Sequence, residues 1–393
     1  MSSSLPETAG RSVKRLVRRT VEALPGTAQQ RAFVAAEGSM YRWPFYRPLA
    51  RPGRREVLMT YDLRCSAPSF GDFMQFALVA RLYQLRRLRT RIVVIDGELR
   101  DDHLALGLDV AANYLVRAGQ YPEIAKAVSV AGMVEVERMS YSEFAAREAE
   151  VGRGTGRYPS RRDQLGRRGV YARSWGVLEY VLRRGSAAAR QRFALTATEV
   201  GANLGLRPPD GDYLAVAVRA ASLSGQDRDV TAPELESWLE RIRAHFPVEP
   251  IWIVSDQAGS DAVRSWGLDP GLRYAPDFGR SFAAHTLLAL GSRGYLQLRG
   301  GGITTGVMWG ATPFFLKADR SNELTRWVEA IYGAGYRFPW GSPLSVWYAP
   351  GAGEVEVQLE QFLRSLRSSA SASAPAPTPA QTPAIVDTVR AAT

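Results

Sequence analysis

The sequence predicts an α/β protein of two tandem Rossmann-like doubly wound domains that face each other across a cleft. Short apolar runs alternate with helical patterns, which is typical of parallel strands joined by helical crossovers. This alternation starts once at Val57 and again near Pro208. The chain has 393 residues, enough for two domains, and its 46% hydrophobic and 23% charged residues are typical of a globular protein.

The first half predicts one α/β unit. We expect strands at 57–63, 92–96 and 131–138, with helices at 72–88 and 104–118. Residues 151–171 have no hydrophobic period and are rich in glycine and arginine, so they predict a mobile basic loop. Helical patterns follow at 174–184 and 187–204.

The second half repeats the alternation. We expect strands at 213–219, 251–256, 295–298 and 314–318, and helices at 233–245, 259–266, 281–290, 321–332 and 353–367, with a short helix after the glycines at 300–302. The predicted organisation is a basic helix and Pro/Arg-rich connector (1–55), an N-terminal domain (56–205), a C-terminal domain (206–367) and a disordered tail (368–393).

The charge distribution and the cysteine content limit the partners and the cellular compartment that we expect for this protein. The net charge is +11, but residues 1–60 hold 11 basic and 4 acidic residues, and residues 151–175 hold seven arginines and one aspartate. The rest is near neutral, which disfavours a nucleic-acid-binding body. Cys65 is the only cysteine, and neither a secretory leader nor a membrane span is evident, so we expect a cytoplasmic protein. The helix at 12–24 either binds the inner face of the membrane or packs on the body.

Polar residues follow two strands of the second unit. Arg219 ends the strand at 213–219, and Ser255 with Asp256 ends the strand at 251–256. Ligands of open α/β sheets bind beyond the carboxyl ends of strands, where a guanidinium can bind a phosphate through two N–H groups. The alternative is that these residues only terminate their strands.

The glycine-rich segment 299–317 is the second indication of phosphate binding. Its glycines allow close backbone approach, and its threonines stand where an N-cap hydroxyl belongs, at the start of a short helix whose N–H groups suit a pyrophosphate. The alternative is a turn needed only for packing. The candidate donor-binding residues here are Gly301, Gly302, Thr304, Thr305 and Lys317.

The first unit offers weaker catalytic candidates. Asp72 follows the turn after the first strand and is either a helix N-cap or a general base for an acceptor hydroxyl, and His103 is a further candidate. The pairs Asp210/Asp212 and Asp227/Asp229 have a spacing used for divalent metals, but short patterns of this kind arise by chance. We therefore expect no metal. The P-loop and the dinucleotide fingerprint are also absent.

Taken together, the strand LAVAVR ending in Arg219, the strand IWIVSD ending in Asp256 and the turn GGGITTG resemble the GT-B glycosyltransferase superfamily, within it the fucosyltransferase-like enzymes. The family's tandem Arg-Arg is Arg219-Ala220 here. The resemblance implies that Thr304 and Thr305 lie near a donor pyrophosphate.

The resemblance implies a hexosyl- or fucosyl-type transferase of cell envelope polysaccharide biosynthesis. Its partners would be a nucleotide-diphosphate sugar and a glycan, lipid-linked or polysaccharide acceptor hydroxyl, with no metal and no cofactor. Fixed positive charge would stabilise the leaving diphosphate. The alternatives are a polysaccharide pyruvyl-type transferase and a non-catalytic protein at the membrane periphery. Nucleic acid is not an expected partner.

Overall fold

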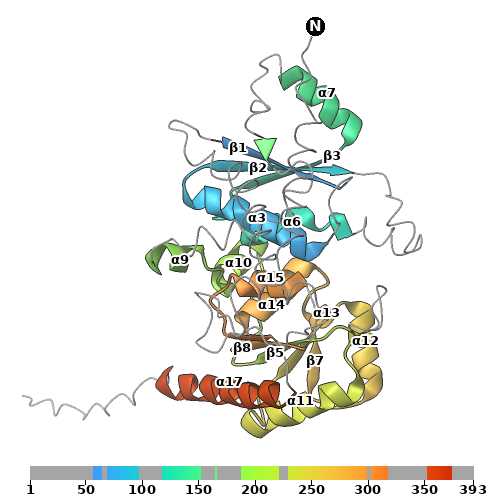
Figure 1. Cartoon of the computed structure of the whole chain (residues 1–393), viewed down its shortest axis with the longest axis vertical. Coiled ribbons are helices and arrows are strands. Elements are labelled where there is room, and N and C mark those ends of the chain that lie inside the picture. Colours follow the sequence, from blue (N-terminus) through green and yellow to red (C-terminus); the bar gives the residue numbers. More distant parts are fainter. Residues whose placement is uncertain are drawn as a thin grey trace, which may run out of the picture.

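The computed structural model describes residues 56–63, 69–96, 117–151, 164–165, 187–220, 229–298, 302–316 and 352–373. These residues form two separate parallel β-sheets with helices on both faces of each (Figure 1). Within the described residues, no helix is both long and apolar enough to cross a membrane.

The first sheet has the strand order β3-β2-β1-β4. Its strands are β1 (Glu56–Asp62), β2 (Arg89–Asp96), β3 (Val134–Ser140) and β4 (Gln164–Leu165), all parallel. Helices α3 (Phe70–Leu85) and α6 (Tyr121–Val128) cover one face, and α7 (Tyr141–Val151) lies over the other (Figure 1).

The second sheet has the order β7-β6-β5-β8-β9 and is also parallel. Its strands are β5 (Leu214–Ala217), β6 (Ile251–Val254), β7 (Leu272–Tyr274), β8 (Gly294–Gln297) and β9 (Phe314–Leu316). Its helices are α11 (Ala232–His245), α12 (Gln257–Trp266), α13 (Ala275–Phe278), α14 (Phe282–Gly291), α15 (Gly302–Met308) and α17 (Ala352–Ser373).

Both sheets follow the same winding. In each unit the chain moves from the first strand outward through two neighbours and then returns to the opposite side of that first strand. This is the strand order of the Rossmann fold, and it places a topological switch point between β1 and β4 and another between β5 and β8. The predicted pair of Rossmann-like units is therefore confirmed.

A layer of buried helices joins the two sheets. Helices α3 and α6 of the first unit meet α14 and α15 of the second unit (Figure 1). The sequences of α3 and α14 are apolar on nearly every side, and both helices are buried all round, as expected for helices enclosed between two sheets. A Cβ on Gly306 would lie 2.8 Å from Thr286 of α14 and 3.4 Å from Met74 of α3, so glycine permits this close approach.

A connector of two short helices, α9 (Ala187–Phe193) and α10 (Ala197–Leu204), links the units. Arg81 of α3 is 1% exposed and donates from Nε to the Phe193 carbonyl at 2.8 Å. Its two terminal nitrogens bind the Glu199 carboxylate of α10 at 2.8 and 2.7 Å. Leu195 in turn bonds through its backbone to Trp309, just beyond α15, so the connector contacts both units.

Several expected elements differ from the structure. The helix predicted at 187–204 is two helices, because Thr196 starts a new one by accepting a hydrogen bond from the Glu199 amide. The last helix runs to Ser373, so the first residues of the predicted disordered tail are helical. Within the predicted loop at 151–171, Gln164–Leu165 pairs with β1 as β4.

The remaining expected elements occur close to their predicted positions, whereas α6, α7, β7 and α13 were not predicted. The predicted helices at 12–24, 174–184 and 321–332 lie outside the described residues, as does nearly all of the one at 104–118. The three boundaries between the four predicted segments stay predictions; the one after residue 205 falls between α10 and β5.

Candidate functional site

The switch point of the second sheet brings the two predicted phosphate-binding features to neighbouring strand ends. Ala217, the last residue of β5, lies opposite Gln297, the last residue of β8. Arg219 follows β5 by two residues, and the glycine-rich segment follows β8 and continues into α15. Ligands of open α/β sheets bind in the crevice at such a point.

Arg219 is held by a carboxylate beside this strand end. Its Nε lies 3.5 Å from Asp229 Oδ1, and the two side chains are 22% and 18% exposed. The carbonyl of Arg219 also accepts a 2.7 Å hydrogen bond from the Val230 amide. The contact with Asp229 orients the planar guanidinium, whose paired N–H groups match phosphate oxygens.

The end of β6 carries Ser255 and Asp256, as predicted. Ser255 is buried, with 8% exposure, whereas Asp256 is exposed. Asp256 is the N-cap of α12, and its Oδ1 accepts a hydrogen bond of 2.9 Å from the Gly259 amide. This capping contact explains the presence of Asp256 at this position without any ligand.

The two threonines of the glycine-rich segment are not N-caps. Helix α15 begins at Gly302, so Thr304 and Thr305 lie inside it, and the prediction of a capping hydroxyl was wrong because the helix starts before the threonines. Thr305 is buried, with 9% exposure. Gly301 and Lys317 lie outside the described residues.

In the first unit, Asp72 lies in the first turn of α3. The N-cap interpretation of Asp72 was wrong, because α3 starts at Phe70 and its N-cap is Ser69, whose hydroxyl accepts from the Asp72 amide at 3.4 Å. Burial raises the pKa of the Asp72 carboxyl, and a side-chain hydrogen bond with Ser69 partly opposes this. A carboxyl with a raised pKa fits a general base. His103 lies outside the described residues.

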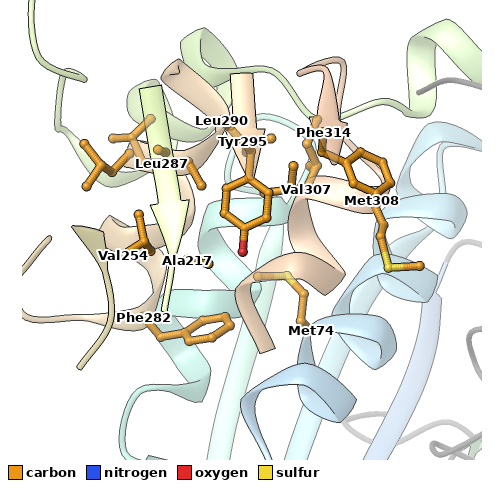
Figure 2. Close-up of a cluster of buried hydrophobic side chains, with 14 of the residues drawn as sticks. Met74, Ala217, Val254, Phe282, Leu287, Leu290, Tyr295, Val307, Met308 and Phe314 are labelled. Carbon is orange, nitrogen blue, oxygen red and sulfur yellow. The ribbon is translucent and has the colours of Figure 1, made fainter. Parts of the chain in front are cut away.

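The carboxyl ends of both sheets open on the same side of the molecule. In each βαβ crossover the helix begins near the carboxyl end of its strand, so α3 begins near the end of β1 and α14 begins on the same side as the end of β5. The Phe70 ring, at the start of α3, lies 4.6 Å from that of Phe282, at the start of α14. Figure 2 shows Met74 and Phe282 in the same buried hydrophobic cluster as Ala217, the last residue of β5.

Sequence reasoning missed His285, a titratable group at this junction. It is 6% exposed on α14, and its Nε2 lies 2.7 Å from the Gly279 carbonyl oxygen. Burial lowers the pKa of His285, against opposing effects of that hydrogen bond and of the Asp256 charge. A histidine in the otherwise apolar run FAAHTLLAL was the available signal. Asp62, fully buried at the end of β1, was also missed.

Among the described residues, no group of three or more His, Cys, Asp or Glu side chains is arranged to hold a metal ion. Two aspartate pairs in the sequence have a spacing used for divalent metals. In the first pair Asp210 is described; in the second, Asp227 lies outside the described residues and Asp229 pairs with Arg219.

Comparison with known proteins gives only remote structural matches. No protein-family model matches the chain, and no curated protein matches it in sequence. E. coli heptosyltransferase WaaC with ADP is similar over 81% of this chain and 99% of its own, at 13% identity and a TM-score of 0.37.

Two further solved structures are similar over most of this chain, again at low identity. The spinosyn forosaminyltransferase SpnP matches 81% of this chain and 94% of its own (11% identity, TM-score 0.29), and the wall teichoic acid polymerase TagF, H444N variant, matches 94% and 92% (10% identity, TM-score 0.28).

Proposed function

We propose that this protein is a glycosyltransferase that moves a sugar from a nucleotide-diphosphate sugar to an acceptor hydroxyl. The observation that carries the proposal is the adjacency of β5 and β8 at the switch point of the second sheet, with Arg219 after one strand and the glycine-rich segment after the other. The second unit would bind the donor and the first unit the acceptor.

The proposed chemistry depends on stabilising the diphosphate as it leaves. Negative charge develops on the diphosphate when the bond to the sugar breaks, and a fixed guanidinium stabilises that charge without having to reorganise. Arg219 is suited to this role, because Asp229 contacts its Nε and so holds the group in place. We propose that the reaction needs no bound metal.

The acceptor hydroxyl must lose a proton during transfer. We propose Asp72 as the general base, because it lies at the carboxyl end of the first sheet and burial raises its pKa towards the range in which a carboxylate accepts protons well. The contact between Phe70 and Phe282 supports this assignment, since it joins the start of the Asp72 helix to the second unit.

The finer identity of the substrates is part of the proposal. We favour a hexosyl or fucosyl donor and a glycan, lipid-linked or polysaccharide acceptor, on the basis of the sequence resemblance. The resemblance also supports a role in cell envelope polysaccharide biosynthesis at the cytoplasmic face of the membrane.

Calorimetry with GDP, UDP and ADP tests the donor site. We expect one of them to bind, binding to be lost in Arg219→Ala, and Arg219→Lys to restore part of it, because lysine keeps the charge but loses the paired N–H geometry. Arg364→Ala is the matched control, since Arg364 is exposed on α17. Absence of binding by all three nucleotides, or equal binding by Arg219→Ala, would overturn the proposal and favour a pyruvyl-type transferase or a binding protein.

A further inference from the structure

The first turn of α14, in the second unit, is capped by side chains of the first unit. Gln120, the residue before α6, accepts a hydrogen bond of 2.8 Å through Oε1 from the Phe282 amide. Glu123, in the first turn of α6, accepts one of 2.8 Å from the Ser281 hydroxyl. We call these four residues the latch: Gln120, Glu123, Ser281 and Phe282.

Helix α6 is fixed firmly to its own sheet. Tyr121, fully buried at the start of α6, stacks on Phe73 of α3 with ring centroids 4.0 Å apart. It also meets the ring of Tyr61 of β1 edge-on at 5.5 Å. The side of the latch that α6 supplies therefore moves with the first unit.

Helix α14 is fixed to the second sheet in the same way. The Tyr213 hydroxyl donates to the Leu288 carbonyl at 2.8 Å, and the Thr312 hydroxyl donates to the Leu290 carbonyl at 2.6 Å. The Leu287 and Leu288 side chains are fully buried. A displacement of one unit relative to the other must therefore be taken up in the layer between the two sheets, where α6 meets α14 at the latch and α3 meets α15.

The opposite end of α6 is tied to the connector. The Asn203 amide on α10 donates to the Ala127 and Ser129 carbonyls, at 3.0 and 2.8 Å. Arg81 adds a 3.2 Å bond to the Val128 carbonyl while it holds the Glu199 carboxylate of α10. Helix α10 is the last helix before β5, so the chain connection between the two units lies at this end of α6, together with these buried hydrogen bonds. This end of α6 is therefore suited to act as a hinge.

We propose that the latch is a breakable lock that holds the two units closed, with the hinge at the α10 end of α6. The eight residues of α6 separate hinge from latch by about 12 Å, so a rotation of about 10° moves the latch by about 2 Å. That displacement breaks hydrogen bonds of 2.8 Å.

Breaking the two hydrogen bonds of the latch costs little because water can replace them. The Phe282 amide belongs to the first turn of α14 and has no partner within its own helix, so it depends on Gln120 or on solvent. Ser281 keeps its own capping bond to the Ala284 amide at 3.1 Å when Glu123 moves away. The lock can therefore release without unfolding α14.

Ser281→Asp separates the locking role from the capping role. Aspartate is as good an N-cap as serine, so α14 keeps its cap, but a second carboxylate would face Glu123 and push the units apart. Glu123→Lys combined with Ser281→Asp replaces the repulsion by an ion pair and restores the closed arrangement. Lys126→Ala, an exposed position on the same helix, is the matched control.

The readout is the distance between spin labels at Ala146→Cys on α7 and Val357→Cys on α17, both exposed positions, with Cys65 replaced by serine. We expect Ser281→Asp to lengthen the mean distance by about 2 Å or more, the displacement calculated for the latch. The charge-swapped pair and Lys126→Ala should give the wild-type distance. Equal distances in Ser281→Asp and the wild type would overturn the proposal.

Amide hydrogen exchange in Gln120→Ala gives a second test that needs no charged substitution. The Phe282 amide should exchange at least tenfold faster than in the wild type, while the Leu288 amide, deep in α14, should keep its protection. If the Phe282 amide exchanges at the same rate in both proteins, Gln120 does not hold the units together and the latch is wrong. Neither test depends on nucleotide binding, so both are independent of the proposed function.

Discussion

Replacing Arg81 should destabilise the protein more than any surface substitution, because this guanidinium ties α3 to the connector. Arg81 is 1% exposed, and its contacts include the Phe193 carbonyl at 2.8 Å and both oxygens of Glu199. Removing one partner of a buried ion pair costs about 3–5 kcal/mol. Glu199 is 29% exposed and can regain water, so we expect Arg81→Met to lower the free energy of unfolding by about 3 kcal/mol.

Two companion variants separate the ion pair from the rest of the network. Glu199→Gln keeps one acceptor for Arg81 but leaves the buried guanidinium without a counter-charge, so it should also cost about 3 kcal/mol. The double variant Arg81→Met/Glu199→Leu should cost less than the two single losses together, because it leaves no unpaired carboxylate.

Urea unfolding followed by circular dichroism at pH 7 measures all three variants. The apolar core runs through both units as one cluster, so we expect a single transition for the described part of the chain. A loss below about 1 kcal/mol in Arg81→Met would refute the reasoning, since that is the value for an exposed pair.

Three further predictions concern the layer between the sheets. Gly306→Ala brings a Cβ to 2.8 Å from Thr286 and should cost about 1–3 kcal/mol in urea unfolding; unchanged stability would contradict the close packing of α15. Burial lowers the pKa of His285 below 6.5, so the unfolded chain takes up the proton first as pH falls. Stability should then fall below pH 6.5 by up to about 1.4 kcal/mol per pH unit, and His285→Gln should reduce that slope; an unaltered slope in urea unfolding at pH 5 to 8 would contradict it. Burial raises the pKa of Asp72, so its ionisation opposes folding. Asp72→Asn should therefore unfold at a higher temperature than the wild type at pH 7 but not near pH 4. A lower melting temperature of this variant at pH 7 would contradict the prediction.

The alternation of apolar runs and helical patterns was enough to predict both sheets. The runs VLMTYDL and IWIV are short and continuous, as parallel strands covered on both faces require, and they form β1 and β6. The strand order could not be read from the sequence, because it depends on which side of the first strand the chain returns to. That order is what places the end of β5 beside the end of β8.

Exact helix starts were harder to predict than helices themselves. Asp72 looked like an N-cap, yet Ser69 three residues earlier is the cap, because serine and aspartate at that spacing both satisfy a helix start. Thr304 and Thr305 were misplaced in the same way. The short strand β4 has only two residues and no period, so only its pairing with β1 reveals it.

Contacts between distant segments were invisible in the sequence. Gln120 and Glu123 are ordinary polar residues at the start of a helix, and nothing near them indicates that they cap a helix about 160 residues further along. The buried histidine of α14 belongs to no sequence motif, because its burial depends on tertiary packing that the sequence around it does not indicate.

A crystal structure with a bound nucleoside diphosphate would test the central claim most directly. The account predicts that the diphosphate lies at the switch point of the second sheet, between the ends of β5 and β8, with its oxygens within hydrogen-bond distance of the Arg219 guanidinium and of backbone amides at the start of α15. A nucleotide bound elsewhere, with Arg219 still paired to Asp229 and no phosphate beside it, would contradict the account.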